Sequence, residues 1–133
     1  MNFRCLCTNA PAENIFKFNA ALGDVHRGVG LSLRPDNVGA HHVDGAGDIP
    51  TLLIDDLALQ GCDLIYLDIE GYELPALRGA ESTIERCKPV ISIEDKGMSE
   101  RYGIAKGEAE AWLGSRFNYR VAERVRRDVV LVP

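Results

Sequence analysis

The sequence predicts a single α/β domain over residues 1–133, with a mostly parallel sheet that ends in an antiparallel hairpin. Short apolar runs alternate with segments of helical periodicity, the last of them at 108–113, and this order is typical of parallel strands covered by helices. The two final apolar segments, 119–125 and 128–132, flank a tight Arg-rich turn, which predicts that they pair with each other.

The N-terminal part predicts a helix, a strand and a loose hairpin. Residues 2–10 place their apolar side chains on one helical face. Residues 14–21 have the composition of a strand and lead into a turn-like Leu-Gly-Asp. The stretch from 25 to 50 is rich in Gly, Pro, Asp and His, and its two strand candidates, 30–33 and 41–43, predict a hairpin over the edge of the domain.

The middle of the chain carries the clearest elements. Residues 51–54 predict an extended segment that leads into a helical turn at 55–56. Residues 63–68 are the clearest strand, because their continuous apolar run suits a strand covered on both faces. Apolar residues at helical spacing predict a helix over 74–84, and residues 90–93 predict a second buried strand.

Composition and charge argue against two classes of protein. Apolar residues make up 46% and charged residues 26% of the chain, as in soluble globular domains. The net charge of −5 argues against a general nucleic-acid binder, because neutralising phosphates requires a basic face. The basic cluster at 116–127 is interrupted by Glu123 and predicts a solvated hairpin surface. No apolar run approaches the roughly 20 residues that cross a bilayer.

The four cysteines indicate a reducing compartment. Cys5 and Cys7 form neither a CxxC redox motif nor half of a zinc site, and Cys62 and Cys87 stand apart from them. Free buried thiols fit the cytoplasm. Residues 1–14 also lack the apolar centre of a signal peptide. We therefore predict a cytoplasmic protein.

Carboxylates gather where two predicted strands end. Asp68 ends one strand and Glu94 ends the next, so both are expected on the rim of the sheet where α/β proteins bind ligands. Glu70 and Glu73 follow on the turn and first helical residues beyond Asp68. Gly71 permits the sharp turn and lets a ligand approach the backbone closely. We expect at least one of these acids to contact a ligand.

Helix capping is the alternative explanation for the acids. A carboxylate at a helix N-terminus meets unpaired amides and the positive end of the helix dipole, which stabilises the helix by roughly 0.3–1 kcal/mol. One or two of the acids are explained in this way. Capping does not explain a group that also includes Asp95, because carboxylates on one rim repel each other unless a cation, a proton or a hydroxyl-bearing ligand lies between them.

The adjacent histidines His41 and His42 lie in the polar stretch before residue 50. Neighbouring side chains of an extended segment point to opposite sides, so the pair is poorly placed to bind one metal ion. We assign no metal site, and a solvated loop is the alternative to any binding role for these residues.

Five segments resemble the C-terminal half of FkbM-type methyltransferases. In chain order they are NAALGD at 19–24, TLLIDDL at 51–57, DLIYLDIEGYE at 63–73, LRGA at 77–80 and KPVISIE at 88–94. The likeness covers about residues 2–95, and the order and spacing of its motifs make it specific.

The resemblance implies a class I, Rossmann-like methyltransferase fold and S-adenosylmethionine as the methyl donor. It implies methyl transfer to a hydroxyl oxygen of a small molecule or sugar. The implied catalytic residues are Asp68, Glu70 and Glu73, since a carboxylate can orient the acceptor hydroxyl and take its proton. The implied cofactor contacts are Ala21, Leu22 and Asp68, and the substrate-binding candidates are Glu94 and His42.

The sequence departs from the family pattern at its beginning. The first strand, the Gly-rich loop and the second strand with its ribose-binding acid have no counterpart, so we expect a domain truncated at the N-terminus that binds the cofactor weakly. We then expect the 15–21 strand to lie beside 64–67, or another copy to pair there in a homodimer. The alternatives are an inactive remnant that binds a partner or dimerises, and a carboxylate metal site with unrelated hydrolytic activity.

Overall fold

The computed structural model describes residues 2–32 and 41–133. The elements are α1 (Asn2–Asn9), β1 (Ala21–Leu22), β2 (Gly28–Ser32), β3 (His42–Leu52), η1 (Ile54–Leu57), β4 (Leu64–Leu67), α2 (Glu73–Arg78), α3 (Glu81–Cys87), β5 (Val90–Glu94), η2 (Met98–Tyr102), α4 (Glu108–Phe117), β6 (Arg120–Val125) and β7 (Asp128–Val132). The helices predicted at 2–10 and 108–113 are confirmed, the second as the longer α4. None of the described helices is both long and apolar enough to cross a membrane.

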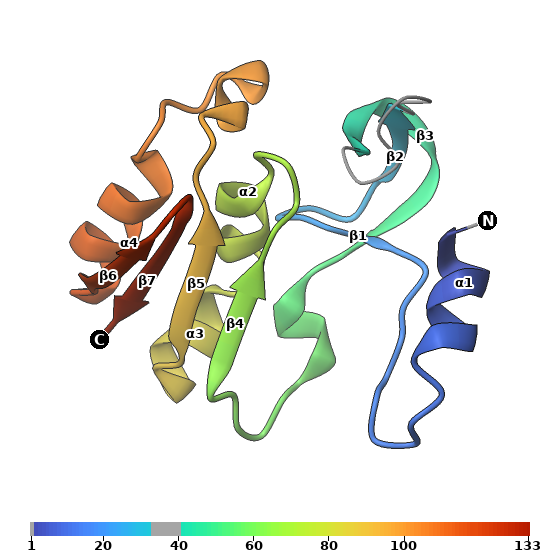
Figure 1. Cartoon of the computed structure of the whole chain (residues 1–133), viewed down its shortest axis with the longest axis horizontal. Coiled ribbons are helices and arrows are strands. Elements are labelled where there is room, and N and C mark those ends of the chain that lie inside the picture. Colours follow the sequence, from blue (N-terminus) through green and yellow to red (C-terminus); the bar gives the residue numbers. More distant parts are fainter. Residues whose placement is uncertain (1, 33–40) are drawn as a thin grey trace.

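One sheet carries the core of the fold. Its strand order is β4-β5-β7-β6; β4 and β5 are parallel, whereas β7 is antiparallel to both of its neighbours. Helices α2, α3 and α4 pack against one face of this sheet (Figure 1), where Ile65 and Ile91 join Leu77, Ile84 and Leu113 in the buried core. The predicted α/β class and C-terminal hairpin are confirmed. The sheet itself is mixed rather than mostly parallel, because only its β4–β5 pair is parallel.

The helix predicted over 74–84 is divided into α2 and α3. A Cβ on Gly79 would lie 2.0 Å from the carbonyl oxygen of Gly23, so the absence of a side chain lets another backbone segment approach at the break. Asp55 supplies the N-terminal contacts of α3, because its carboxylate accepts the backbone N–H of Ser82 at 3.0 Å and of Thr83 at 2.8 Å. At the break between α2 and α3, backbone and side-chain contacts therefore connect these helices to Gly23 and Asp55 in the first half of the chain.

The second sheet has the order β1-β3-β2. Strands β2 and β3 form an antiparallel hairpin with a register shift at Val29, which confirms the hairpin predicted from residues 30–33 and 41–43. Both strands are longer than predicted. Residues 33–40 lie outside the described part of the chain, so the predicted strand is not tested at residue 33.

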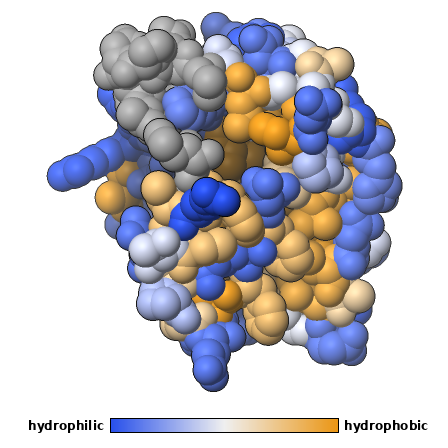
Figure 2. Space-filling model, turned by 90° about the vertical axis from the view of Figure 1, so that its right-hand side faces the viewer, coloured by the Kyte–Doolittle hydropathy of each residue, from blue (hydrophilic) through white to orange (hydrophobic). Residues whose placement is uncertain are grey.

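The strand predicted at 14–21 is wrong except for its last residue. Only Ala21–Leu22 is extended in a sheet, and it pairs in parallel with Thr51 and Leu52 of β3. Phe16 and Phe18 are 83% and 53% exposed, and Figure 2 shows broad apolar areas on this side of the molecule. Apolar composition favours a strand only when a core face and a partner strand are also present, and neither can be seen in a local pattern.

The prediction that the 63–68 strand is covered on both faces is also wrong. Ile65 and Leu67 are buried, but Leu64 and Tyr66 are 58% and 59% exposed. The second edge of β4 pairs with no strand of the described chain, so the arrangement with 15–21 beside it is wrong as well. Pairing of this edge with a second copy remains a prediction.

Candidate functional site

Three predicted acids meet at the carboxyl ends of β4 and β5. Asp68, Glu70 and Glu94 each place a carboxylate oxygen within 4.8 Å of the others. The strand register explains the meeting, because Leu67 pairs with Ile93 and the next residue of each strand reaches the same edge. The prediction that acids from the two strands share one rim is confirmed. We call these three residues the acid cluster.

Lys96 compensates part of the charge of the acid cluster. Its Nζ lies 2.5 Å from a carboxylate oxygen of Glu94 and 3.5 Å from one of Glu70. The hydrogen bond to Glu94 raises the pKa of Lys96. Burial raises the pKa of Glu94, and the neighbouring carboxylate of Asp68 adds to the rise, although the hydrogen bond from Lys96 lowers it. Three carboxylates around one ammonium leave the cluster negative overall.

The turn after β4 adopts an uncommon backbone conformation. Glu70 has φ +57° and Gly71 has φ +99°, both in the left-handed region that side chains disfavour. A Cβ on Gly71 would lie 2.5 Å from the carbonyl carbon of Met98 in η2. The turn is therefore held against η2, and its conformation directs the carboxylate of Glu70 into the acid cluster. Conformations of this kind recur at ligand sites.

Glu73 lies outside the acid cluster and is only 5% exposed. Its Oε1 accepts the backbone N–H groups of Ile69 at 3.1 Å and of Gly71 at 3.2 Å. Burial raises the pKa of Glu73, although the two backbone hydrogen bonds lower it. Glu73 thus holds the turn that carries Glu70, which is close to the capping role considered from the sequence.

The two predicted substrate contacts lie in different places. Glu94 belongs to the acid cluster, whereas His42 is the first residue of β3 and lines a separate cavity of about 340 Å³. The other lining residues of that cavity are Arg27, Val43, Asp44, Gly45, Tyr72, Arg101 and Tyr102. The predicted cofactor contacts Ala21 and Leu22 belong to β1 of the second sheet and are not part of the acid cluster.

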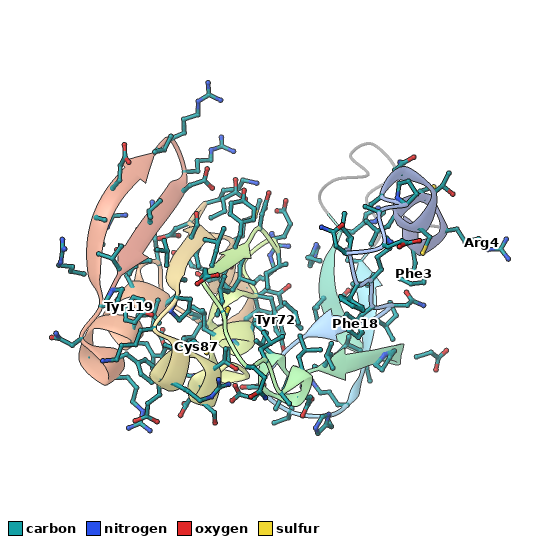
Figure 3. The ribbon with its side chains drawn as sticks, turned by 90° about the horizontal axis from the view of Figure 1, so that it is seen from below. Phe3, Arg4, Phe18, Tyr72, Cys87 and Tyr119 are labelled. Atoms are coloured by element: carbon teal, nitrogen blue, oxygen red, sulfur yellow. The ribbon has the colours of Figure 1, made fainter. Side chains whose placement is uncertain are left out.

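Two tyrosines connect the predicted motif to this cavity. Tyr72 lies between the two sheets (Figure 3), and its ring meets that of Tyr102 edge-on at 4.8 Å. The Tyr72 hydroxyl accepts a hydrogen bond from Arg27 at 2.5 Å, and Tyr102 donates one to the carbonyl of Val43 at 2.9 Å. Sequence reasoning missed these residues. The sequence signal that could have identified Tyr72 is its position inside the predicted motif, between Gly71 and Glu73.

The profile of the Methyltransferase FkbM domain matches residues 14–121. The chain belongs to the FkbM methyltransferase family. This confirms the family indicated by the Asp-Ile-Glu-Gly-Tyr-Glu motif, and it assigns the acid cluster to an FkbM domain.

A crystal structure of Methyltransferase FkbM from Methylobacillus flagellatus KT has a similar fold. The TM-score is 0.54 at 22% sequence identity, over 98% of this chain and 31% of that protein. This chain therefore corresponds to about a third of that methyltransferase's length. A search of the curated proteins finds no match.

Proposed function

We propose that this FkbM domain takes part in S-adenosylmethionine-dependent methyl transfer to a hydroxyl oxygen of a small molecule or sugar. The observation that carries the proposal is the acid cluster at the carboxyl ends of β4 and β5, in a chain that matches the FkbM domain over residues 14–121. The four cysteines are free, although Cys5 and Cys7 are exposed and not buried as predicted; free thiols support a cytoplasmic location for this activity.

The charge of the acid cluster fits this cofactor. Lys96 offsets only part of the charge of three carboxylates, so a positively charged ligand group is favoured there. S-Adenosylmethionine supplies a methyl group activated by a positively charged sulfur. Asp68 would hold the charged part of the cofactor, and Ala21 and Leu22 would supply apolar contacts to its base.

The remaining acids are suited to the acceptor. Glu70, on the turn with φ +57°, would accept a hydrogen bond from the acceptor hydroxyl; its carboxylate would orient the attacking oxygen and receive its proton. Glu94 would bind a second hydroxyl or share the proton, since its raised pKa makes it a better proton acceptor than an ordinary carboxylate. Glu73 would act on this step through the turn, as a positioning residue. His42 would contact the part of the substrate that lies in the cavity of Arg27 and Tyr72.

The direct test is methyl transfer from isotope-labelled S-adenosylmethionine to a panel of hydroxylated acceptors. Glu70→Gln should lower the rate at least about tenfold, because it removes a proton acceptor without changing the side chain's shape. Glu85→Gln, on the exposed face of α3, is the matched control and should leave the rate unchanged. Equal rates for both variants would contradict the role of Glu70.

A second candidate function is a binding or dimerisation module without activity. The unpaired edge of β4 and the exposed side chains of Leu64 and Tyr66 favour it, because an apolar edge strand invites pairing with another chain. Absence of methyl transfer together with a stable dimer would support this candidate. The carboxylate metal site is the least favoured alternative, because the ammonium group of Lys96 already lies against Glu94 and Glu70.

A further inference from the structure

A basic cavity lies beside the acid cluster. It has a volume of about 540 Å³ and opens at the end of β5 and the tip of the C-terminal hairpin. Its charged lining comprises five cationic side chains and two carboxylates, namely Lys96, Lys106, Arg124, Arg126, Arg127, Asp95 and Asp128. In a chain of net charge −5, this excess of cations at one place calls for a specific explanation.

Three of the cations form no ion pair within the described part of the chain. Arg124 pairs with Glu110, and Lys96 pairs with acids of the acid cluster. Within the described chain, no carboxylate lies within 4.0 Å of the charged nitrogens of the other three, Lys106, Arg126 and Arg127. The solvated hairpin surface predicted from the sequence is confirmed, since residues 120–127 are exposed, and the structure also places these cationic side chains around a hollow.

The sheet fixes the position of the two arginines of the turn. Glu94 of β5 pairs with Asp128 of β7, and the backbone N–H of Asp95 donates to the carbonyl of Arg127 at 2.9 Å. The turn between β6 and β7 accordingly lies beside the carboxyl end of β5 (Figure 1). Arg126 adopts φ +58°, a conformation that this tight turn imposes on a non-glycine residue. The arginines are therefore presented by a hydrogen-bonded hairpin and not by a free loop.

Lys96 connects the two sites. It lines the basic cavity, and its ammonium group binds Glu94 and Glu70 of the acid cluster. A molecule whose hydroxyl lies at the acid cluster would thus have the basic cavity next to another part of its structure. Guanidinium groups bind phosphate and carboxylate through paired, charge-assisted hydrogen bonds, which favours an oxyanion as the occupant.

We propose that the basic cavity binds the anionic group of the methyl acceptor, a phosphate or carboxylate carried by a hydroxylated compound. Its volume lies within the range of about 300–1,000 Å³ that is typical of small-molecule sites. The assignment of this anion to the methyl acceptor rests on the proposed function. Anion binding by the cavity does not, so the two are tested separately.

The binding test uses the purified chain and NMR titration at an ionic strength of about 0.15 M, where the Debye length is about 8 Å. The probes are glucose 6-phosphate, glucuronate and neutral glucose, which separate phosphate, carboxylate and sugar as the recognised group. We expect at least one anionic probe to bind at the hairpin turn and glucose not to bind there. The variant Arg126→Gln/Arg127→Gln should weaken binding at least about tenfold, because it removes two charge-assisted contacts.

The control variant is Arg78→Gln/Arg120→Gln. It removes the same total charge from two exposed arginines that do not line the cavity, and we expect less than about a twofold change because salt screens distant charges. Equal weakening in both variants would overturn the proposal, since it would indicate attraction to overall charge. Binding of glucose as tight as that of the anions, or no anion binding at the turn, would also overturn it.

Methyl transfer then tests the role of the cavity. A higher kcat/KM for acceptors that carry an anion, lost in Arg126→Gln/Arg127→Gln and kept in the control, would support it. Anion binding without any methyl transfer would leave the cavity as a binding site and refute the proposed function instead. Transfer that is equally efficient to neutral acceptors in all variants would refute the acceptor role of the cavity alone.

Discussion

The turn that carries Glu70 should depend on the buried carboxylate of Glu73. Glu73→Ala removes the acceptor of the Ile69 and Gly71 amides. It also leaves unfilled the space that the glutamate side chain occupies. Breaking two hydrogen bonds and leaving the Ile69 and Gly71 amides unpaired in a part-buried turn should lower the free energy of unfolding by about 2–4 kcal/mol. Glu73→Gln keeps an acceptor oxygen and should change it by less than about 1 kcal/mol.

Urea denaturation followed by circular dichroism measures these differences. Glu85→Ala in α3 is the control, since it removes an exposed carboxylate and should change the free energy of unfolding by less than about 0.5 kcal/mol. A loss below about 1 kcal/mol in Glu73→Ala would refute the reasoning, because it would mean that the turn stands without its carboxylate anchor.

The pH dependence supplies an independent check on Glu73. Burial raises its pKa above the ordinary value of 4.5, so the folded chain retains this proton at pH values where the unfolded chain has lost it. The stability that depends on this proton is therefore fully present below pH 4.5. It is lost as the pH rises through the pKa of Glu73 in the folded chain. Glu73→Gln lacks this group, so its stability relative to the parent chain should increase over that interval. A constant difference would contradict the raised pKa.

Three further predictions concern the proposed function and the assembly of the chain. Calorimetry on the purified chain should show S-adenosylmethionine binding no tighter than about 100 μM, a free energy near −5.5 kcal/mol. Residues 1–133 contain no Gly-rich strand-to-helix turn whose backbone amides could supply directed polar contacts to the cofactor. A low-micromolar dissociation constant would contradict this. Lys96→Met removes an ammonium group that favours the ionised form of Glu94, so the pKa of Glu94 should rise. The acidic limb of the pH–activity profile should then move to higher pH. An unchanged profile would argue against a role of Glu94 in the reaction. Light scattering should detect a homodimer that Tyr66→Lys dissociates, because this side chain is exposed on the edge strand; a monomer at all concentrations would refute pairing in trans.

The acid cluster could be predicted from the sequence because it depends on one regular feature. Parallel strands end at the same edge, so Asp68 and Glu94 had to meet once both strands were identified. The separation of Glu73 from the cluster could not be predicted in this way. Its side chain turns back onto the amides of Ile69 and Gly71, and that choice depends on the conformation of a turn rather than on strand order.

Features built from distant loops could not be predicted from the sequence. Lys96 reaches the cluster from the segment after β5, and Tyr102 meets Tyr72 from η2, an element with no predicted counterpart. The uncovered face of β4 was missed for another reason. The run from Leu64 to Leu67 is apolar on both sides, and local sequence does not reveal whether a second layer covers the alternate residues.

The same strand register places the acids and the arginines at one edge of the sheet. Leu67 pairs with Ile93, and Glu94 pairs with Asp128, so the acid cluster and the hairpin turn are neighbours through backbone hydrogen bonds alone. A slip of one residue would turn Glu94 toward the helix-covered face and Ile93 toward solvent. A carboxylate buried there without a partner is strongly unfavourable, so the apolar alternation that builds the core also fixes where the polar groups of both proposed sites lie.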